Sequence, residues 1–398
     1  MTAQGHPSGA IPSIGARTHF PKLTSFAYLN HASQAPLSAP VCDAIAARVD
    51  LMAREGTGAF PAVSAGLDRV RAQLAALLGA APDEVGLVSS TTTGVLHVAY
   101  GLAWAPGDRV VLFDGEFPAN VTPWLRAAET FGVEPVFVPL EPFHRSHDEG
   151  LAAVDAALEG GRVRLVAVSA VQYRSGLRMP VEALAARAHA HGAALFVDVA
   201  QALGMVPFEV GGADFVAGSS HKWLLGPEAA GLLYIAPSRL AELVPRLAGW
   251  ASVEHAFDFL SLGPGRLDYA RPVRRRADFV EGAGRATLAY AGLEAALTML
   301  SALDPAAVFA HVGAYLDRLE RPLTERGFRS LRTPFPEGRS GILALEPPLG
   351  VDGPALQAAL TARGVACSLP DGALRLSPHY ANALEEVPEV LAAFDAAV

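Results

Sequence analysis

The chain has 398 residues, of which 51% are hydrophobic and 18% are charged, and this composition excludes a disordered chain. Its length is sufficient for a large core and predicts two or more domains. The formal net charge of −9 argues against nucleic acid as a main partner.

Membrane, secretion and metal signals are missing from the sequence. No uninterrupted apolar run approaches the roughly 20 residues of a membrane helix, so we expect no membrane partner. The first residues show no basic start followed by an apolar stretch, so we expect no secretion signal and a cytoplasmic location. Cys42 and Cys367 provide no disulfide framework, and neither has the spacing of a metal site. We therefore expect no bound metal.

Short apolar runs alternate with helical patterns over the first three quarters of the chain. The predicted strands lie in residues 84–90, 109–115, 134–140, 163–169, 193–199, 214–220 and 231–236. Because these runs are apolar on both faces and amphipathic stretches such as 181–192 separate them, they indicate a mainly parallel sheet covered by helices on each side. In such an α/β sheet, ligands bind beyond the carboxyl ends of the strands.

The pattern changes after about residue 295. Predicted helices cover residues 306–326 and 353–364 and begin again at about residue 384, and predicted strands lie near 341–346, 365–369 and 373–377. This indicates a second, α+β domain. We expect an N-terminal arm of residues 1–27, a large domain of residues 28–295 and a smaller C-terminal domain of residues 296–398. The Pro-rich and Gly-rich stretch 249–285 is predicted to be a functional loop.

Lysine is rare in this chain. Lys22 and Lys222 are the only two, against 29 arginines. An amine that survives in an arginine-rich protein suits a task that a guanidinium cannot perform, because a desolvated lysine loses its proton and can bond covalently to a carbonyl carbon. Lys22 lies in a polar stretch typical of a surface lysine. Lys222, in "GSSHKWLLGPEAAGLLYI", is therefore the predicted nucleophile.

Two further motifs follow predicted strands. "SSTTTG", residues 89–94, opens a helix, so its hydroxyls and backbone N–H groups could hold a phosphate at the positive end of the helix dipole. Helix capping for stability alone would produce the same residues. "FVDVAQ" ends an apolar strand with Asp198, a carboxylate that is costly to bury unless it meets a cation.

In this order, the three motifs resemble the pyridoxal phosphate enzymes of fold type I. Within them, the chain resembles the aminotransferase class V family, which includes cysteine desulfurases, selenocysteine lyases, kynureninases and isopenicillin N epimerase. The resemblance runs from "YLNHASQAPLS" at Tyr28 to "LRLSPHYAN" ending at Asn382, and its specific core is "DVAQ" followed by "SSHKW". It implies a mainly parallel seven-stranded sheet between helices, a smaller C-terminal α+β domain, and a homodimer with the active site at the interface.

The resemblance also implies a role for each matching residue. Lys222 would bind the cofactor covalently and then move the proton at the substrate α-carbon, while Asp198 would pair with the pyridinium nitrogen. Gln201 would bond the phenolic oxygen. The other implied cofactor contacts are Thr91, Thr92, Ser219 and His221 at the phosphate, Ala200 and Phe117 on the two ring faces, and Ala283; the implied substrate contacts are Asn30, His31, Gln172, Tyr173 and Arg375, the last as a two-pronged carboxylate clamp.

Departures from the family pattern bear on the reaction. Phe117 stands where desulfurases have a histidine, and phenylalanine can stack on a ring but cannot transfer protons. Cys367, in "GVACSL", resembles a buried strand cysteine rather than a persulfide carrier. Gln172 and Tyr173 stand where desulfurases have an asparagine, which indicates a reshaped pocket. Ala283 stands where the family's Gly-Thr-Pro-Asn segment has threonine, so a hydroxyl contact is lost.

We therefore predict a homodimeric pyridoxal phosphate enzyme that acts on a small amino acid by removing its α-proton. Transamination, β-elimination of the C–S lyase type and epimerisation all remain open. One alternative is a cysteine desulfurase or selenocysteine lyase that uses Cys367. Others are a catalytically silent scaffold that binds pyridoxal phosphate, and a doubly wound nucleotide-binding protein with a structural lysine.

Overall fold

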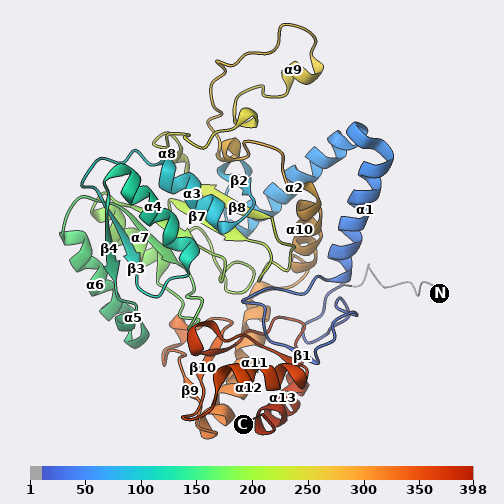
Figure 1. Ribbon diagram of the computed structural model, residues 1–398, viewed down its shortest axis with the longest axis vertical. Helices are drawn as coiled ribbons and strands as arrows, with labels where there is room; N and C mark the ends of the chain where they lie inside the picture. The colour runs from blue at the N-terminus through green and yellow to red at the C-terminus, as the bar shows by residue number, and fades with distance from the viewer. Residues whose placement is uncertain (1–10, 398) are drawn as a thin grey trace.

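A computed structural model describes residues 11–397 of the chain, and its centre is a seven-stranded sheet (Figure 1). The spatial order is β2-β8-β7-β6-β5-β3-β4. Their bounds are Val85–Val88 (β2), Arg109–Phe113 (β3), Glu134–Val138 (β4), Val163–Ser169 (β5), Ala194–Asp198 (β6), Phe215–Ser219 (β7) and Gly231–Ile235 (β8). Strand β8 runs opposite to the other six strands, which are parallel to one another. The mainly parallel α/β sheet is thus confirmed, and each predicted run contains one strand.

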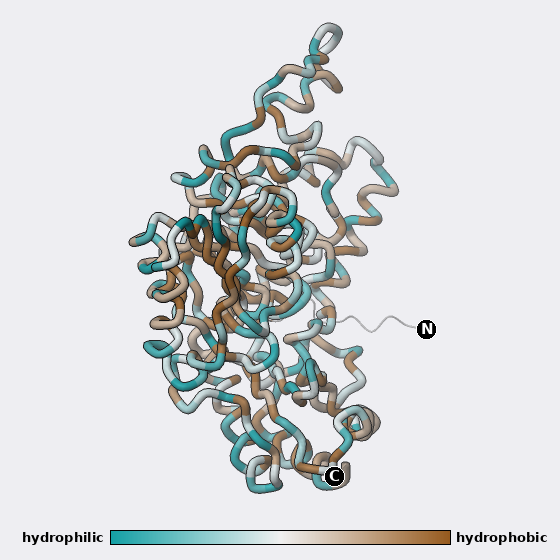
Figure 2. The backbone as a smooth tube through the Cα atoms, turned by 60° about the vertical axis from the view of Figure 1, so that its left-hand side comes forward, coloured by the Kyte–Doolittle hydropathy of each residue, from teal (hydrophilic) through white to brown (hydrophobic). Residues whose placement is uncertain are grey.

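The strands form because their apolar side chains are covered on both faces. Every residue of β6 and β7 is buried. Alternate residues of β6 enter different cores: Phe196 packs against Trp124 in one core, and Val197 belongs to the other. Figure 2 shows these hydrophobic strands grouped in the middle of the molecule. Such two-sided burial is typical of a parallel sheet between helices.

Ten helices precede the C-terminal part of the described chain. They are Ala39–Glu55 (α1), Phe60–Leu78 (α2), Thr91–Gly101 (α3), Thr122–Phe131 (α4), Glu141–Arg145 (α5), His147–Glu159 (α6), Val181–Ala190 (α7), Pro237–Leu240 (α8), Asp258–Ser261 (α9) and Thr287–Leu300 (α10). Helix α7 ends two residues before Gly192, whose φ of 72° suits a helix stop. The predicted helix over 181–192 is therefore confirmed.

The C-terminal part forms a separate small sheet with its own helices. Its elements are Pro305–Glu325 (α11), Arg329–Ser330 (β9), Leu343–Glu346 (β10), Gly353–Ala362 (α12), Val365–Ala366 (β11), Leu374–Leu376 (β12) and Val387–Asp395 (α13). Strand β10 lies between β12 and β9, antiparallel to both. The smaller α+β unit is confirmed, although the sequence did not predict the two-residue strand β9.

The N-terminal segment is tied to this small sheet. Ala27–Tyr28 (β1) pairs with β11 in parallel, and Asn30 forms a further bridge with Ser377. The chain therefore passes the C-terminal unit before it enters the large sheet. The domain boundaries at residues 27 and 295 stay a proposal, and residues 1–10 of the proposed arm lie outside the described residues.

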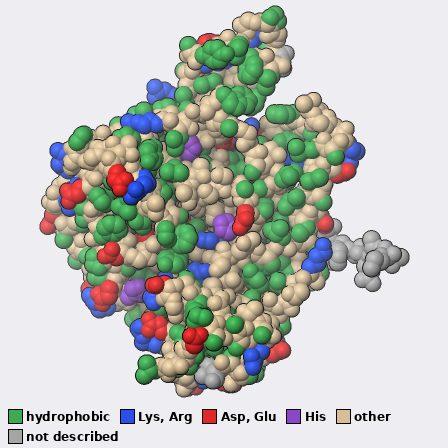
Figure 3. All heavy atoms as spheres, viewed as in Figure 1, with side chains coloured by type: hydrophobic (Ala, Val, Ile, Leu, Met, Phe, Trp, Pro, Cys, Tyr) green, Lys and Arg blue, Asp and Glu red, His purple; other side chains and the backbone are tan. Residues whose placement is uncertain are grey.

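A loop projects from the body beyond α8 (Figures 1 and 3). We call residues 253–273 the projecting loop, since Val253 and Val273 form an antiparallel bridge at its base. It carries exposed apolar side chains, among them Leu267 and Tyr269, which is 92% exposed. Within residues 11–397, no single helix is long and apolar enough to cross a membrane; the pair α10 and α11, bent by 85°, passes that test by length and composition only.

Candidate active site

A cavity of about 360 Å³ lies where the carboxyl ends of β5, β6 and β7 meet the N-terminus of α3. This is the edge at which a parallel sheet gathers its loops, so residues far apart in sequence converge there. The lining residues are Ala32, Ser33, Ser90, Thr91, Thr92, Phe117, Ala119, Ser169, Val171, Tyr173, Asp198, Ala200, Gln201, Ser219, His221, Lys222, Pro370 and Arg375. Eleven of the fifteen predicted site residues are among them.

Lys222 lies in a tight loop that leaves β7. Its carbonyl accepts from the N–H of Leu225, which has a φ of 56°, a conformation that costs a leucine energy and marks a constrained turn. Burial, opposed by the Asp198 carboxylate and supported by the Arg375 charge, lowers the pKa of Lys222 to about 8. The amine thus approaches the neutral, nucleophilic form near physiological pH.

Asp198 ends β6 inside the cavity. Burial raises its pKa to about 6, against the lowering effects of the Ala200 N–H, which donates to Oδ1 at 2.8 Å, and of the Lys222 charge. The carboxylate forms no ion pair at close range within the described chain. A protonated ring nitrogen would supply the missing cation.

Gln201 links the cavity to the structure behind it. Its Nε2 donates to the Ala32 carbonyl at 2.9 Å, and its Oε1 accepts from Trp223 Nε1 at 2.8 Å. One N–H of the amide therefore remains for a bound group. Gly204 allows this packing, because a Cβ there would lie 2.5 Å from the Trp223 carbonyl oxygen.

The hydroxyl-rich wall lies at the start of α3. Ser90 caps the helix by accepting from the Thr93 N–H, which leaves the first N–H groups of the helix available. Thr91 Oγ1 is buried and has no hydrogen-bond partner. Ser219 and His221 face the same cavity, and burial followed by the Lys222 charge lowers the His221 pKa. These features suit an anion that accepts several hydrogen bonds.

Arg375, on β12, brings the small sheet into the cavity. Its guanidinium donates to Ser368 Oγ at 3.1 Å, to the Tyr173 carbonyl at 2.7 Å and to Ser33 Oγ at 2.7 Å. Burial lowers its pKa to about 10, and no described carboxylate forms an ion pair with it. A positioned cation with two free N–H groups is suited to a substrate carboxylate.

Phe117 and Tyr173 form the opposite wall. Their ring centroids lie 5.3 Å apart at an angle of 72°, and Lys222 Nζ lies 5.3 Å from the centroid of the Phe117 ring. Phe117 is 43% exposed, so its face is open to the cavity. The ring is therefore available to stack on a planar group.

Four predicted site residues lie outside this cavity. His31 is buried and stacks 6.3 Å from Trp223, and Asn30 lies in the bridge to Ser377. Gln172 points its amide at Glu116, with 3.0 Å between Nε2 and Oε1. Ala283 is exposed on the loop before α10 and is not part of the cavity lining.

Sequence reasoning missed three polar residues of the site. Ser33 and Ser169 line the cavity, and Glu116 is buried behind Ser169. Serines carry little signal in a sequence, and Ser169 was recognised only as the end of a strand. Glu116 precedes Phe117 in the quoted "GEFPANVTPW", and a carboxylate next to a ring-facing position after a strand could have been noticed.

The residues present fit pyridoxal phosphate. Thr91 Oγ1 is an unpaired buried hydroxyl where a phosphate would bind, Lys222 offers an amine to the aldehyde, and Asp198 offers a carboxylate to the ring nitrogen. Within residues 11–397, no group of three or more His, Cys, Asp or Glu could hold a metal ion. The donor set therefore matches an organic cofactor with a phosphate and an aldehyde.

The fold and this cavity define a pyridoxal phosphate-dependent enzyme of fold type I. The family model described as Aminotransferase class-V matches residues 27–374. The chain belongs to the aminotransferase class-V family, and it is an enzyme that uses pyridoxal phosphate to act on an amino acid.

Relatives of several activities share this sequence pattern. The chain is 33% identical to isopenicillin N epimerase of Streptomyces clavuligerus, over 84% of this chain and 85% of that protein. It is 28% identical to the uncharacterized aminotransferase YcbU of Bacillus subtilis, strain 168, over 93% and 94%. Among solved structures, a mutant of C-DES with glycine covalently linked to its cofactor matches with a TM-score of 0.86 and 24% identity, over 95% of this chain and 98% of that one. This last likeness supports the fold.

Proposed function

We propose that the enzyme moves the α-proton of a small amino acid with Lys222 and passes no sulfur to a protein thiol. The main support for this proposal is the buried amine of Lys222, which lines the cavity with Asp198 and Arg375 and has a pKa lowered to about 8. An amine that titrates near the working pH can accept a proton and return it. Proton exchange by Lys222 is the chemistry that the sequence predicts. The roles of the individual site residues are part of the proposal.

Each wall of the cavity has a separate task in this reaction. Arg375 binds the substrate carboxylate, Phe117 holds the face of the planar ring, and the α3 N-terminus with Thr91 and Ser219 holds the phosphate. Pyridoxal phosphate, when bound, supplies an electron sink for the negative charge that develops at the α-carbon. Asp198 keeps that sink effective because its carboxylate stabilises a proton on the ring nitrogen. Lys222, on the cavity floor, exchanges the proton.

The outcome of proton removal can be transamination, β-elimination or epimerisation. The similarity to isopenicillin N epimerase over 84% of the chain favours return of the proton to the α-carbon. Phe117, which lines the cavity at the ring-stacking position, has no titratable group of its own to compete for that proton. Products therefore decide between the three branches, and all three need Lys222.

Sulfur transfer to Cys367 is disfavoured by the surroundings of the thiol. Cys367 is 4% exposed, lies outside the cavity lining, and has a pKa raised by burial to about 12. The thiolate is the form that attacks sulfur. A cysteine held as a thiol and shielded from the substrate cannot accept it, which argues against the desulfurase alternative.

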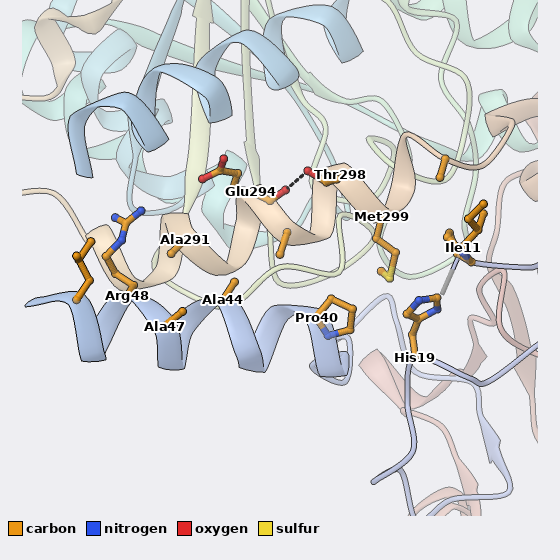
Figure 4. A pocket seen from close by; sticks show the side chains of 14 residues that line it. Ile11, His19, Pro40, Ala44, Ala47, Arg48, Ala291, Glu294, Thr298 and Met299 are labelled. Atoms are coloured by element: carbon orange, nitrogen blue, oxygen red, sulfur yellow. Dashed lines mark hydrogen bonds between the residues drawn. The ribbon is translucent and has the colours of Figure 1, made fainter. Parts of the chain in front are cut away.

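We also propose that two copies assemble, as implied by the family resemblance. An apolar groove of about 570 Å³ lies between α1 and α10, lined by small side chains such as Ala44, Ala47 and Ala291 (Figure 4). The projecting loop adds exposed Leu260, Leu262 and Tyr269 (Figure 3). Apolar surface of this kind is stabilised by a second copy. Analytical ultracentrifugation should give twice the mass of one chain; a monomer at micromolar concentration would contradict it.

The cytoplasmic location stays a prediction.

The test of the function uses the two lysines as a matched pair. Borohydride reduction of the pyridoxal phosphate-loaded protein followed by peptide mapping should label Lys222 and leave Lys22 unlabelled. Lys222→Ala should lose the covalent bond and essentially all turnover, while Lys22→Ala should behave as the unsubstituted protein. Label on another residue would contradict the assignment.

A screen of amino acids identifies the reaction branch. The visible absorbance of the loaded protein should change with its substrate, and mass spectrometry should reveal an oxo acid, an inverted amino acid, or an eliminated fragment with ammonia. No change with any amino acid would favour the silent scaffold. A colourless protein that binds no pyridoxal phosphate would favour the nucleotide-binding alternative.

A further inference from the structure

Glu116 is a buried carboxyl group that the reaction above leaves without a task. It follows β3 and is 7% exposed as a residue. Oε1 accepts from the backbone N–H of Ser169 at 2.6 Å and from Gln172 Nε2 at 3.0 Å, and Oε2 accepts from the Ser169 hydroxyl at 2.5 Å. Three donors therefore converge on one side chain.

Ser169 connects this carboxyl group to the cavity. It ends β5, lines the cavity, and is the register partner of Asp198 on β6. A serine hydroxyl has one proton. Because Ser169 gives that proton to Glu116, its oxygen can only accept hydrogen bonds from the cavity side while the carboxyl group is ionised.

The charges around Glu116 leave both of its protonation states accessible. Burial, opposed by the donors on Ser169 and Gln172 and supported by the Asp198 carboxylate, raises the pKa of Glu116 to about 7. No described Lys, Arg or His lies within ion-pair distance of Glu116, and Lys222 acts on Asp198. Near neutral pH the carboxyl group can therefore hold or release a proton.

The geometry also determines which oxygen can take that proton. Oε1 is held by the backbone N–H of Ser169, which can only donate, so Oε1 must remain an acceptor. Oε2 faces a hydroxyl, which can exchange donor and acceptor roles. A proton on Oε2 would thus be donated to Ser169 Oγ, and the serine proton would be directed to the cavity.

We propose that Glu116 is a positioning residue whose protonation state determines whether Ser169 offers the cavity a lone pair or a proton. This rests on the proposed function for its role in the reaction. When a protonated group of the bound amino acid or cofactor gives a proton to Ser169 Oγ, the serine's own proton moves to Glu116 Oε2. The donor's bond to its proton breaks as a new O–H bond forms on Ser169, and the former O–H bond of Ser169 breaks as one forms on Glu116, so no oxidation state changes. The reverse movement returns the proton.

This pair gives the cavity a proton route separate from Lys222. Phe117 cannot transfer a proton, and the lowered pKa of His221 favours its neutral form at the phosphate wall. Ser169 with Glu116 is therefore the arrangement that can store a proton next to Asp198. A reaction that must return a proton from a group other than Lys222 would use it.

Infrared spectroscopy of the protein without cofactor tests the carboxyl group itself. A C=O band of a protonated, buried carboxyl group should disappear as the pH rises through about 7, and this band should be missing in Glu116→Gln. It should persist in Ser169→Ala at a shifted frequency, because one hydrogen bond is lost. A band unchanged by Glu116→Gln would overturn the proposal.

Visible absorbance of the loaded protein tests the connection to the cavity. A transition with the same midpoint should occur in the unsubstituted protein and in the matched control Glu281→Gln, which alters a buried carboxylate outside the cavity. The transition should vanish in Glu116→Gln and in Ser169→Ala, while both variants keep the covalent cofactor bond. If the absorbance transition persisted in either variant, the proposal would be wrong. If the unsubstituted protein formed no covalent bond between the cofactor and Lys222, the proposed function would be refuted. The infrared result would still test the Glu116 proposal, because it is measured without the cofactor.

Discussion

Two groups of buried charge in this molecule follow opposite rules. At the base of the projecting loop, a polar cavity of about 390 Å³ contains Arg71, Arg285 and Glu281. Glu281 accepts from Arg71 at 2.7 Å and from Arg285 at 3.0 Å. In the active-site cavity, Lys222 and Arg375 form no ion pair within the described chain. Each cation of the first group has a carboxylate partner, and these two cations of the second group have none.

The difference appears in the pKa of two arginines, the partly buried Arg71 and the buried Arg375. Burial alone would lower the pKa of Arg71, but Glu281 and Asp68 more than offset it, so the pKa is raised. Burial lowers the pKa of Arg375 to about 10, because no carboxylate compensates. A buried ion costs several kcal/mol unless a partner offsets it. Unpaired charge in a cavity is therefore charge reserved for a ligand, and paired charge maintains the fold.

The largest effect on turnover, and the strongest test of the contrast between unpaired and paired charges, is expected at Asp198. In Asp198→Asn, the ring nitrogen loses its anionic partner, so kcat should fall by about a hundredfold to a thousandfold. The fold should not suffer, because a buried carboxylate without an ion pair is replaced by a neutral amide of the same shape. Stopped-flow kinetics and thermal unfolding of the same samples measure both quantities. Full activity in this variant would show that Asp198 is a structural residue.

The two arginines give a matched pair of substitutions. Arg375→Gln should raise KM by about a hundredfold, since a charged contact with the substrate carboxylate is lost, and should change stability little. Arg71→Gln should leave KM unchanged and lower the free energy of unfolding by about 3 kcal/mol, because Glu281 loses a buried partner. Steady-state kinetics and urea unfolding measure the two. Equal effects on KM would remove the distinction between the two groups.

Much of the fold was predictable because the strands carry a strong local signal. Runs such as residues 193–199 are apolar at nearly every position, and no exposed helix would tolerate that pattern. The two-residue strands β1 and β9 lack this signal, since pairing with distant partners alone defines them. The parallel pairing of β1 with β11 joins residues more than 300 positions apart, which no local pattern can indicate.

The site residues also divide into those with a signal in the sequence and those that only the structure reveals. Asp198 and Lys222 have chemistry that is costly to bury, so their sequence context raised the question of a partner, whereas Arg375 was indicated only by the family resemblance. The Thr91 hydroxyl and Ser169 became informative only when the structure showed one without a partner and the other bonded to Glu116. Gln172 was expected to face the substrate, and it points at Glu116 because a buried carboxyl group requires donors.

The pH dependence of stability should also separate the two groups of charge. Folding raises the pKa of Glu116 from 4.5 to about 7 and that of Asp198 from 3.8 to about 6. At these two groups the folded cofactor-free protein binds more protons than the unfolded chain between pH values of about 4 and 7, so their contribution to stability falls as the pH rises through this window. The buried His97 and His379, whose pKa values burial lowers to about 4, contribute with the opposite sign. Compared with the unsubstituted protein, Glu116→Gln should therefore lose a decline of a few kcal/mol over this window, whereas Glu281→Gln should keep the slope of the unsubstituted protein. Urea unfolding at several pH values measures this, and an unchanged slope in Glu116→Gln would contradict it.

The smallest effect on turnover is expected at Cys367, a buried group that belongs to neither set. Its side chain is part of the main apolar core, and burial raises the thiol pKa to about 12. Cys367→Ala should therefore leave kcat and KM unchanged and cost about 1 kcal/mol of stability, from the small space left by the sulfur. Mass spectrometry after incubation with cysteine should find no persulfide on Cys367, with Cys42→Ala as the control for the other thiol.

A persulfide on Cys367, together with loss of sulfur release in Cys367→Ala, would mean that this strand opens to the cavity during turnover. The cavity would then hold a third reactive group, and the desulfurase alternative would replace proton transfer as the function.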